Sequence, residues 1–135
     1  MDFLSETTYV DQAERVIDKL LEPIVDKRTG RSRQRTIVST SKMRNILSMA
    51  ADIYDNVMRS SAKELSQDIV ARIEYLRVRM IYESGRESTV KSFIDEAKLL
   101  DYVKMIGNDK NKYILFYRYL EALVAFRKFK GGKDE

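Results

Sequence analysis

Residues 65–85 read LSQDIVARIEYLRVRMIYESG and decide the expected fold. The stretch holds no proline, and its glycine comes last. Successive residues of an α-helix turn by about 100°, so this segment carries two apolar faces on opposite sides. One face consists of Ile69, Ile73, Leu76 and Met80, and the other of Tyr75, Val78 and Tyr82. Because a helix that is apolar on several sides is typical of a buried position, we expect this helix to be central, with neighbours all round it.

The composition extends this expectation to the whole chain. The 135 residues, of which 44% are hydrophobic and 34% charged, suit one globular domain spanning residues 1–135. One proline and five glycines favour long uninterrupted helices. We therefore expect an all-α fold, a single-domain bundle of about five helices.

The four other helices follow from apolar spacing and capping residues. Thr7 or Thr8 can cap the first helix, and Pro23 lies near its end. The second has Thr40 or Ser41 as its N-cap. The fourth begins after Ser88 and ends before Gly107. Asn108 or Asp109 caps the fifth, which ends near Phe129, and residues 130–135 are expected to fray. No segment alternates between apolar and polar residues as a half-buried strand would.

Between the first two helices the chain is strongly basic. Residues 26–36 read DKRTGRSRQRT, with a glycine at position 30 that breaks any helix. We expect residues 26–40 to form a basic loop. Its cations are Lys27, Arg28, Arg31, Arg33 and Arg35, against the single acid Asp26.

The residue types that are missing exclude many functions. The chain has no cysteine and no histidine, so it offers no disulfide, no zinc–thiolate site and no imidazole base. We expect a protein that is not an enzyme and uses no metal or other cofactor. A carboxylate-dependent nuclease built on Asp52 and Asp55 stays open as an alternative. No apolar run is long enough to span a membrane and the first residues lack a signal peptide, so we expect a cytoplasmic location.

The charge permits a polyanionic partner, since the net charge is +4 and the isoelectric point about 9.2. In the third helix Arg72, Arg79 and Arg86 recur every seven residues and share one flank, whereas Arg77 points elsewhere. This stripe could meet successive phosphates. Alternatively, Glu83 could pair with its neighbouring arginines as on any solvated helix face.

The start of the second helix is a second basic candidate. Lys42 and Arg44 lie in its first turn, where free backbone N–H groups also suit an anion. These groups predict a phosphate site. Ordinary surface charge is the alternative.

Three segments carry a resemblance to a known family. They are TSKMRNILSMAADIYDNV (40–57), EYLRVRMIYESGRE (74–87) and YLEALVAFRKF (119–129). In this order they resemble the signatures of the small helical subunit of the type III-A CRISPR RNA-guided interference (Csm) complex. Ser84 stands where the family usually has alanine, and Arg72 matches no family motif.

The resemblance implies a non-catalytic prokaryotic subunit of antiviral defence, present in several copies. Its implied partners are the guide RNA–target RNA duplex (chiefly the target strand), the backbone and large subunits of the complex, and adjacent copies of itself. It would contact the RNA sugar-phosphate backbone without sequence specificity, because base pairing reads the sequence. The implied RNA-binding residues are Lys42, Arg44, Asn45, Arg79 and Arg86, with Arg77 as a secondary candidate that could instead pair with Glu74. The loop residues Arg31, Arg33 and Arg35 are added from their charge alone.

A different class of function also fits this sequence. The protein could be a purely structural helical spacer whose arginines make only protein–protein ion pairs.

Overall fold

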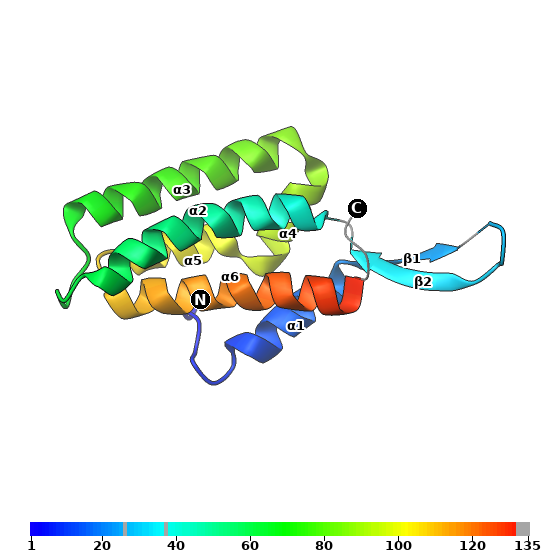
Figure 1. Ribbon diagram of the computed structural model, residues 1–135, viewed down its shortest axis with the longest axis horizontal. Coiled ribbons are helices and arrows are strands. Elements are labelled where there is room, and N and C mark those ends of the chain that lie inside the picture. The colour runs from blue at the N-terminus through cyan, green and yellow to red at the C-terminus, as the bar shows by residue number, and fades with distance from the viewer. Residues whose placement is uncertain (26, 37, 132–135) are drawn as a thin grey trace.

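A computed structural model describes residues 1–25, 27–36 and 38–131, and for residues 22–25, 32–36 and 131 it describes only the backbone. Six helices and one two-stranded antiparallel sheet make up this part of the chain (Figure 1). The elements are α1 (Tyr9–Lys19), β1 (Leu21–Val25), β2 (Ser32–Thr36), α2 (Thr40–Arg59), α3 (Gln67–Arg86), α4 (Ser88–Ala97), α5 (Leu99–Ile106) and α6 (Lys110–Gly131).

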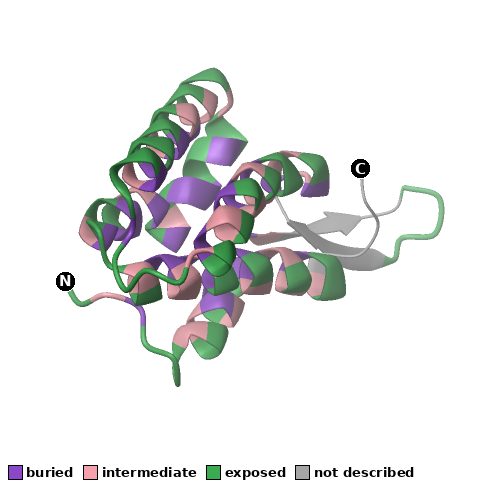
Figure 2. Ribbon diagram, turned by 60° about the vertical axis from the view of Figure 1, so that its left-hand side comes forward, coloured by how far each residue is buried: buried purple, intermediate pink, exposed green. Residues whose placement is uncertain are grey.

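The bundle is organised around α6. This helix packs against α1, α2 and α5, while α3 packs against α2, α4 and α5 on the opposite side of the body (Figure 1). Buried residues lie on the inward sides of the helices (Figure 2). The predicted helical bundle is therefore confirmed, with six helices in place of about five.

The predicted central position of α3 is wrong. Its first apolar face is buried as expected, at Ile69, Ile73, Leu76 and Met80. Its second face is open, with Tyr75 62%, Val78 55% and Tyr82 52% exposed. The described helices cover α3 from one side only, because α6 occupies the centre of the bundle instead.

The predicted fourth helix is two helices. Lys98 separates α4 from α5 and adopts the left-handed conformation, with φ 58°. This break turns the chain so that Ala97 and Leu99, on its two sides, are both buried. The Tyr119 hydroxyl donates a hydrogen bond of 2.9 Å to the carbonyl of Ala97, which ends α4. A lysine gives no sequence signal for such a turn, since glycine and asparagine are the usual residues there.

The predicted basic loop is largely a β-hairpin. Leu21–Val25 pairs antiparallel with Ser32–Thr36, and Gly30 adopts a positive φ of 72° in the connection. A helix that continued through Pro23 would bring its ring against the carbonyl of Lys19, the residue at which α1 ends. Proline is tolerated in this sheet because both of its strands are edges. The hairpin projects from the end of the body at which α2 begins and α3 ends (Figure 1).

The helix termini differ slightly from expectation. Ser39, one residue before the predicted candidates, caps α2 by accepting a 3.3 Å hydrogen bond from the backbone N–H of Lys42. Asp109 accepts from the backbone N–H of Lys112 at 3.1 Å, as its predicted capping role requires. Helix α6 continues to Gly131, and residues 132–135 of the predicted frayed tail lie outside the described residues.

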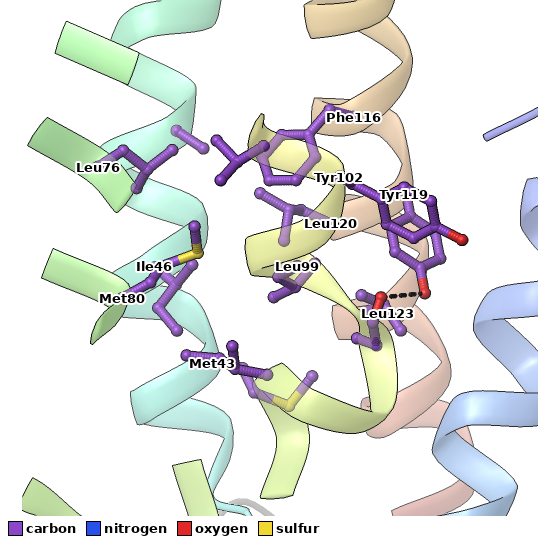
Figure 3. Packing of buried hydrophobic residues seen from close by; sticks show 14 of the residues in the cluster. Met43, Ile46, Leu76, Met80, Leu99, Tyr102, Phe116, Tyr119, Leu120 and Leu123 are labelled. Atoms are coloured by element: carbon purple, nitrogen blue, oxygen red, sulfur yellow. Dashed lines mark hydrogen bonds between the residues drawn. The ribbon is translucent and has the colours of Figure 1, made fainter. Parts of the chain in front are cut away.

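Helix α6 contributes both apolar packing and hydrogen-bonding side chains to the core. Phe116, Tyr119 and Leu120 pack among side chains from α2, α3 and α5 (Figure 3). The Tyr113 hydroxyl donates to the carbonyl of Ala50 at 2.6 Å. Arg127, which is 3% exposed, donates from Nε to the carbonyl of Val38 at 3.2 Å. These bonds tie α6 to α2 and to the segment that follows the hairpin.

Candidate nucleic-acid interface

A groove between α2 and α3 brings together predicted site residues from two of the three motifs. Lys42 and Asn45 of α2 and Arg79 of α3 line a cavity of about 300 Å³. Asp52 and Glu83 line the same cavity. The groove thus presents an ammonium group, an amide and a guanidinium group together with two carboxylates.

Helical spacing explains why these side chains converge. Positions 42, 45, 49 and 52 of α2 follow the 3-4 spacing of one helix face, and this face turns toward α3. Arg79 and Glu83, four residues apart, share the facing side of α3. Packing of the neighbouring buried residues Ile46 and Met80 fixes the two helices against each other (Figure 3).

The cations of this region are held by carboxylates of the same chain. Glu83 lies 3.3 Å from Arg79 and 3.7 Å from Arg86, and its side chain is 17% exposed. Lys42 Nζ lies 2.9 Å from Glu87 Oε1. The i+4 and i+3 pairs of Glu83 are those that the sequence offered as the alternative to a phosphate site.

Tyr82 gives the two arginines a common support. The guanidinium carbons of Arg79 and Arg86 lie 5.1 and 5.5 Å from the centre of its ring, within the range of cation–π attraction. The ring and Glu83 therefore hold both guanidinium groups in a defined position. Such an arrangement limits the side-chain entropy lost when an anion binds.

Two predicted residues of the same motifs lie elsewhere. Arg77 forms an ion pair of 3.3 Å with Glu74, as its helical phase predicted, and its Nε is buried without a hydrogen-bond partner among the described residues. Arg44 is exposed on α2 and does not line the groove, because it precedes Asn45 by one residue, about 100° of helical rotation. The predicted phosphate site of Lys42 and Arg44 is thus split between two directions.

The basic hairpin is a separate feature. Arg31 is exposed beside the turn, and its backbone N–H donates to Thr29 Oγ1 at 3.3 Å. Arg33 and Arg35 lie in β2, opposite Ile24 and Glu22 in the strand register, and their side chains lie outside what the structure describes. The hairpin lies at the end of the body at which α2 begins and α3 ends (Figure 1), and the groove is lined by residues near these two helix ends.

Comparisons with known proteins agree with the motifs. A family model described as Csm2 Type III-A matches residues 15–133. The chain belongs to the Csm2 family. The family predicted from the three motifs is therefore confirmed.

Several curated relatives of the Csm2 family match over most of the chain. One from Streptococcus thermophilus is 37% identical over 134 residues, covering 99% of this chain and 100% of its own. One from Mycobacterium tuberculosis strain H37Rv is 38% identical over 98 residues, covering 73% and 79%. One from Enterococcus italicus is 37% identical over 118 residues, covering 82% and 84%. Each of these three proteins is named CRISPR system Cms protein Csm2.

The other predicted candidates are not gathered into a site. Asp52 lines the groove, whereas Asp55 acts near Tyr117, where burial, then the charge of Glu121 and then the charge of Asp55 raise the pKa of the hydroxyl. Within residues 1–25, 27–36 and 38–131, no three His, Cys, Asp or Glu side chains cluster as metal ligands would. No described helix combines the length and apolar character that crossing a membrane requires.

Sequence reasoning missed that Asp52 lines the groove of this Csm2 family member and that Glu87 pairs with Lys42 at its edge. Glu87 follows the last residue of α3, and its pairing with Lys42 is a tertiary contact between segments 45 residues apart. No local spacing rule predicts such a pair. The 3-4 spacing of Asp52 with Asn45 and Met49 could have placed it on the same face of α2.

Proposed function

We propose that this Csm2 family member is the small, non-catalytic subunit of a type III-A CRISPR complex and contacts the sugar-phosphate backbone of the guide RNA–target RNA duplex without reading its sequence. The observation that carries this proposal is the convergence of Lys42, Asn45 and Arg79 on one groove. The curated name of its relatives assigns those proteins to a CRISPR system.

The donors in the groove suit phosphate and sugar oxygens. Arginine presents a planar fork of N–H groups that matches a phosphate, and lysine supplies a mobile point charge. The amide of Asn45 can donate to a phosphate or a 2′-hydroxyl oxygen. Such contacts fix position and orientation but carry no sequence information, which a subunit serving any guide requires.

The intrachain carboxylates set the affinity of this groove. A phosphate that binds Arg79 must compete with Glu83, and one that binds Lys42 must compete with Glu87. Exposed ion pairs of this kind contribute about 0.2–1 kcal/mol, so a phosphate with greater charge can displace them. We expect weak binding by one copy and strong binding by several copies held in a row.

The proposal places the protein beside adjacent copies of itself and beside the backbone and large subunits. Arg86, more exposed than Arg79, extends the basic surface beyond the groove. Arg31, Arg33 and Arg35 belong to the hairpin, which projects from the end of the body at which α2 begins. We infer that these residues add secondary contacts, since the duplex is longer than one groove.

The structural-spacer alternative has an observation of its own. Lys42, Arg79 and Arg86 already have carboxylate partners within the chain, as they would if their role were only to stabilise the bundle. The two proposals differ in their dependence on salt. Contacts to phosphate release counterions, whereas an isolated spacer has no salt-dependent RNA affinity.

The deciding experiment measures binding of a fluorescent RNA duplex, long enough to present several successive phosphates, at a series of salt concentrations. Arg79→Ala and Lys42→Ala should each weaken binding equally for two unrelated duplex sequences and flatten the salt dependence of the affinity. The slope of log K against log salt should flatten by about 0.7–0.9 for each phosphate that the variant no longer binds. Lys91→Ala is the matched control, because it removes a cation with an i+4 carboxylate partner on α4.

Arg77→Ala separates the groove from general basicity. It removes a paired arginine from the same helix but from outside the groove, and we expect unchanged RNA affinity. A sequence-dependent loss in the Arg79 variant, or an unchanged salt slope, would contradict the proposed phosphate contact.

A further inference from the structure

The outer face of α3 is an exposed apolar ridge that the described helices leave uncovered. It consists of Ala71, Tyr75, Val78, Tyr82 and Gly85, which we call the outer seam. All five residues are exposed, and Ile81 beside them is 50% exposed. Isolated exposed apolar residues are common, but a continuous row along one helix is typical of an interaction surface.

The spacing of the outer seam indicates what kind of element covers it. Its residues follow one another at intervals of four, three, four and three, the repeat with which helices pack along a shared seam. The row spans about 21 Å at 1.5 Å per residue. Gly85 has open space at the position of a Cβ, so a partner backbone can approach closely there. A helix could therefore contact the whole row.

A hollow beside the seam offers a site for an anchoring side chain. A cavity of about 360 Å³ between α2 and α3 is lined mainly by apolar groups, among them Met49, Ile53, Tyr75 and Leu76. Arg72 and Asp52 also line this cavity. A large aliphatic or aromatic side chain from the partner would fill it, as an interface anchor does.

Stacking of RNA bases would use fewer residues of the outer seam than packing of a helix would. Only Tyr75 and Tyr82 are aromatic, and they lie about 10.5 Å apart along the helix axis. Val78 lies between them, and the ring of Tyr82 is already occupied by Arg79 and Arg86. The aliphatic and small members of the seam have no use in stacking.

The charge along one flank of the seam specifies the partner further. Arg72, Arg79 and Arg86 follow this flank, and Glu83 is the one carboxylate paired with them in the described part of the chain. Arg72 has no ion-pair partner among the described residues. The opposite flank carries Glu74 and Ile81. A partner helix should therefore carry carboxylates on the side that faces the arginines.

The α3 helix of a second copy does not meet this requirement. Packed antiparallel, two seams would bring the arginine flanks against each other. Packed parallel, each arginine flank would meet Glu74, which already pairs with Arg77, and Ile81. The occupant should therefore come from a different protein.

We propose that the outer seam docks an amphipathic α-helix of another protein chain, with apolar residues at 3-4 spacing and aspartate or glutamate on the flank facing Arg72. The five seam residues and Arg72 do not line the RNA groove, although Arg79 of the same flank and Met49 and Asp52 of the hollow do. The two proposals can therefore fail independently.

A photo-crosslinking experiment in the assembled type III-A complex tests the occupant. The crosslinking amino acid p-benzoylphenylalanine replaces Val78, and the same substitution at the exposed Lys104 of α5 gives the background. We expect a crosslink to a helical segment of another subunit that carries at least two carboxylates on one flank. A crosslink to RNA, a crosslink to a second copy, or no crosslink above background would overturn the proposal.

Substitutions supply a second measurement. Val78→Asn keeps the charge and alters an exposed position, so the free protein should keep its fold and its RNA affinity. Its incorporation into the complex, measured by competition with the wild type, should fall about tenfold or more. Arg72→Glu should also lower incorporation. Normal incorporation of the Val78 variant, or improved incorporation of the Arg72 variant, would overturn the proposed helix or its acidic flank.

Discussion

Helices α6 and α3 are alike in sequence and opposite in their surroundings. Both are long, both carry large apolar residues on more than one side, and both contain arginine and tyrosine. In α6 Tyr113, Phe116 and Tyr119 are completely buried, whereas in α3 Tyr75 and Tyr82 are more than half exposed. Tyr113 and Tyr119 donate hydrogen bonds to carbonyls of neighbouring helices, but no such bond from Tyr75 or Tyr82 is present in the described part of the chain.

The difference shows what an apolar face does and does not specify. Helical periodicity identifies the faces that gain from burial, but the same pattern results whether a face packs within its own chain or against a partner. The polar atoms make the distinction. A buried tyrosine needs a partner for its hydroxyl, whereas an exposed one finds water.

The largest expected contrast is in stability. Phe116→Ala in α6 should lower the free energy of unfolding by about 3–5 kcal/mol, because it leaves a cavity in the core. Val78→Ala on the outer seam should change it by less than about 0.5 kcal/mol. Urea denaturation of the two variants measures both values. A large loss for the Val78 variant would mean that the seam is covered in the free protein.

Tyr119→Phe should cost about 1–3 kcal/mol, since the carbonyl at the end of α4 loses its donor in a buried site. Tyr82→Phe is the matched control and should be close to neutral. Thermal melting of both variants at neutral pH gives the comparison. An equal loss of stability in the two variants would contradict the contrast between the buried tyrosine of α6 and the exposed tyrosine of α3.

The burial of Tyr119 also predicts that the stability of the protein depends on pH. Burial is the largest cause that raises the pKa of the Tyr119 hydroxyl above its usual range. An unfolded tyrosine ionises near pH 10, so this stabilisation is complete below about pH 10 and is lost as the pH rises above it. The fall in melting temperature above about pH 10 should be smaller in Tyr119→Phe than in wild type. An identical fall would show that Tyr119 ionises as freely in the folded protein as in the unfolded chain.

Gly85→Ala should stabilise the free protein by about 0.5–1 kcal/mol, because alanine favours a helix and a Cβ meets nothing there. If a helix packs on the outer seam, the same methyl group should weaken incorporation into the complex. Denaturation and the competition assay measure the two effects separately. A gain in both stability and incorporation would show that no partner backbone approaches Gly85.

The smallest expected effect concerns the carboxylate between Arg79 and Arg86. Glu83→Gln should raise the affinity for the RNA duplex by up to about fivefold, since an exposed ion pair contributes no more than about 1 kcal/mol. Glu74→Gln, which frees only Arg77, should leave the affinity unchanged. A lower RNA affinity of the Glu83→Gln variant would mean that this carboxylate orients the two arginines more than it competes with phosphate for them.

Much of the helical fold could be predicted because its signals are local. The buried face of α3, the cap at Asp109 and the end of α1 before Pro23 all follow from spacing and backbone chemistry. The hairpin could not be predicted, since the polar residues of β2 show no apolar alternation. The break at Lys98 is held by tertiary contacts from α6, which local sequence does not encode.

The candidate site was partly predictable for the same reason. Helical phase separated Arg79 from Arg77 and identified the Glu74 and Glu83 pairs, all within one helix. It could not show that Lys42 meets Glu87, or that Asn45 faces Arg79 across a groove. Those contacts depend on how α2 packs against α3.

The pairing of Lys42 with Glu87 and of Arg79 with Glu83 has a consequence for selectivity in the cell. Under the proposed function, ribosomal RNA, transfer RNA and DNA would compete in large excess with the guide-bound target for a protein with an isoelectric point near 9.2. Because carboxylates of the same chain pair with Lys42 and Arg79, a single molecule should bind these polyanions only weakly. If the proposed function holds, only a row of aligned grooves on one duplex multiplies the remaining attraction enough to outcompete them.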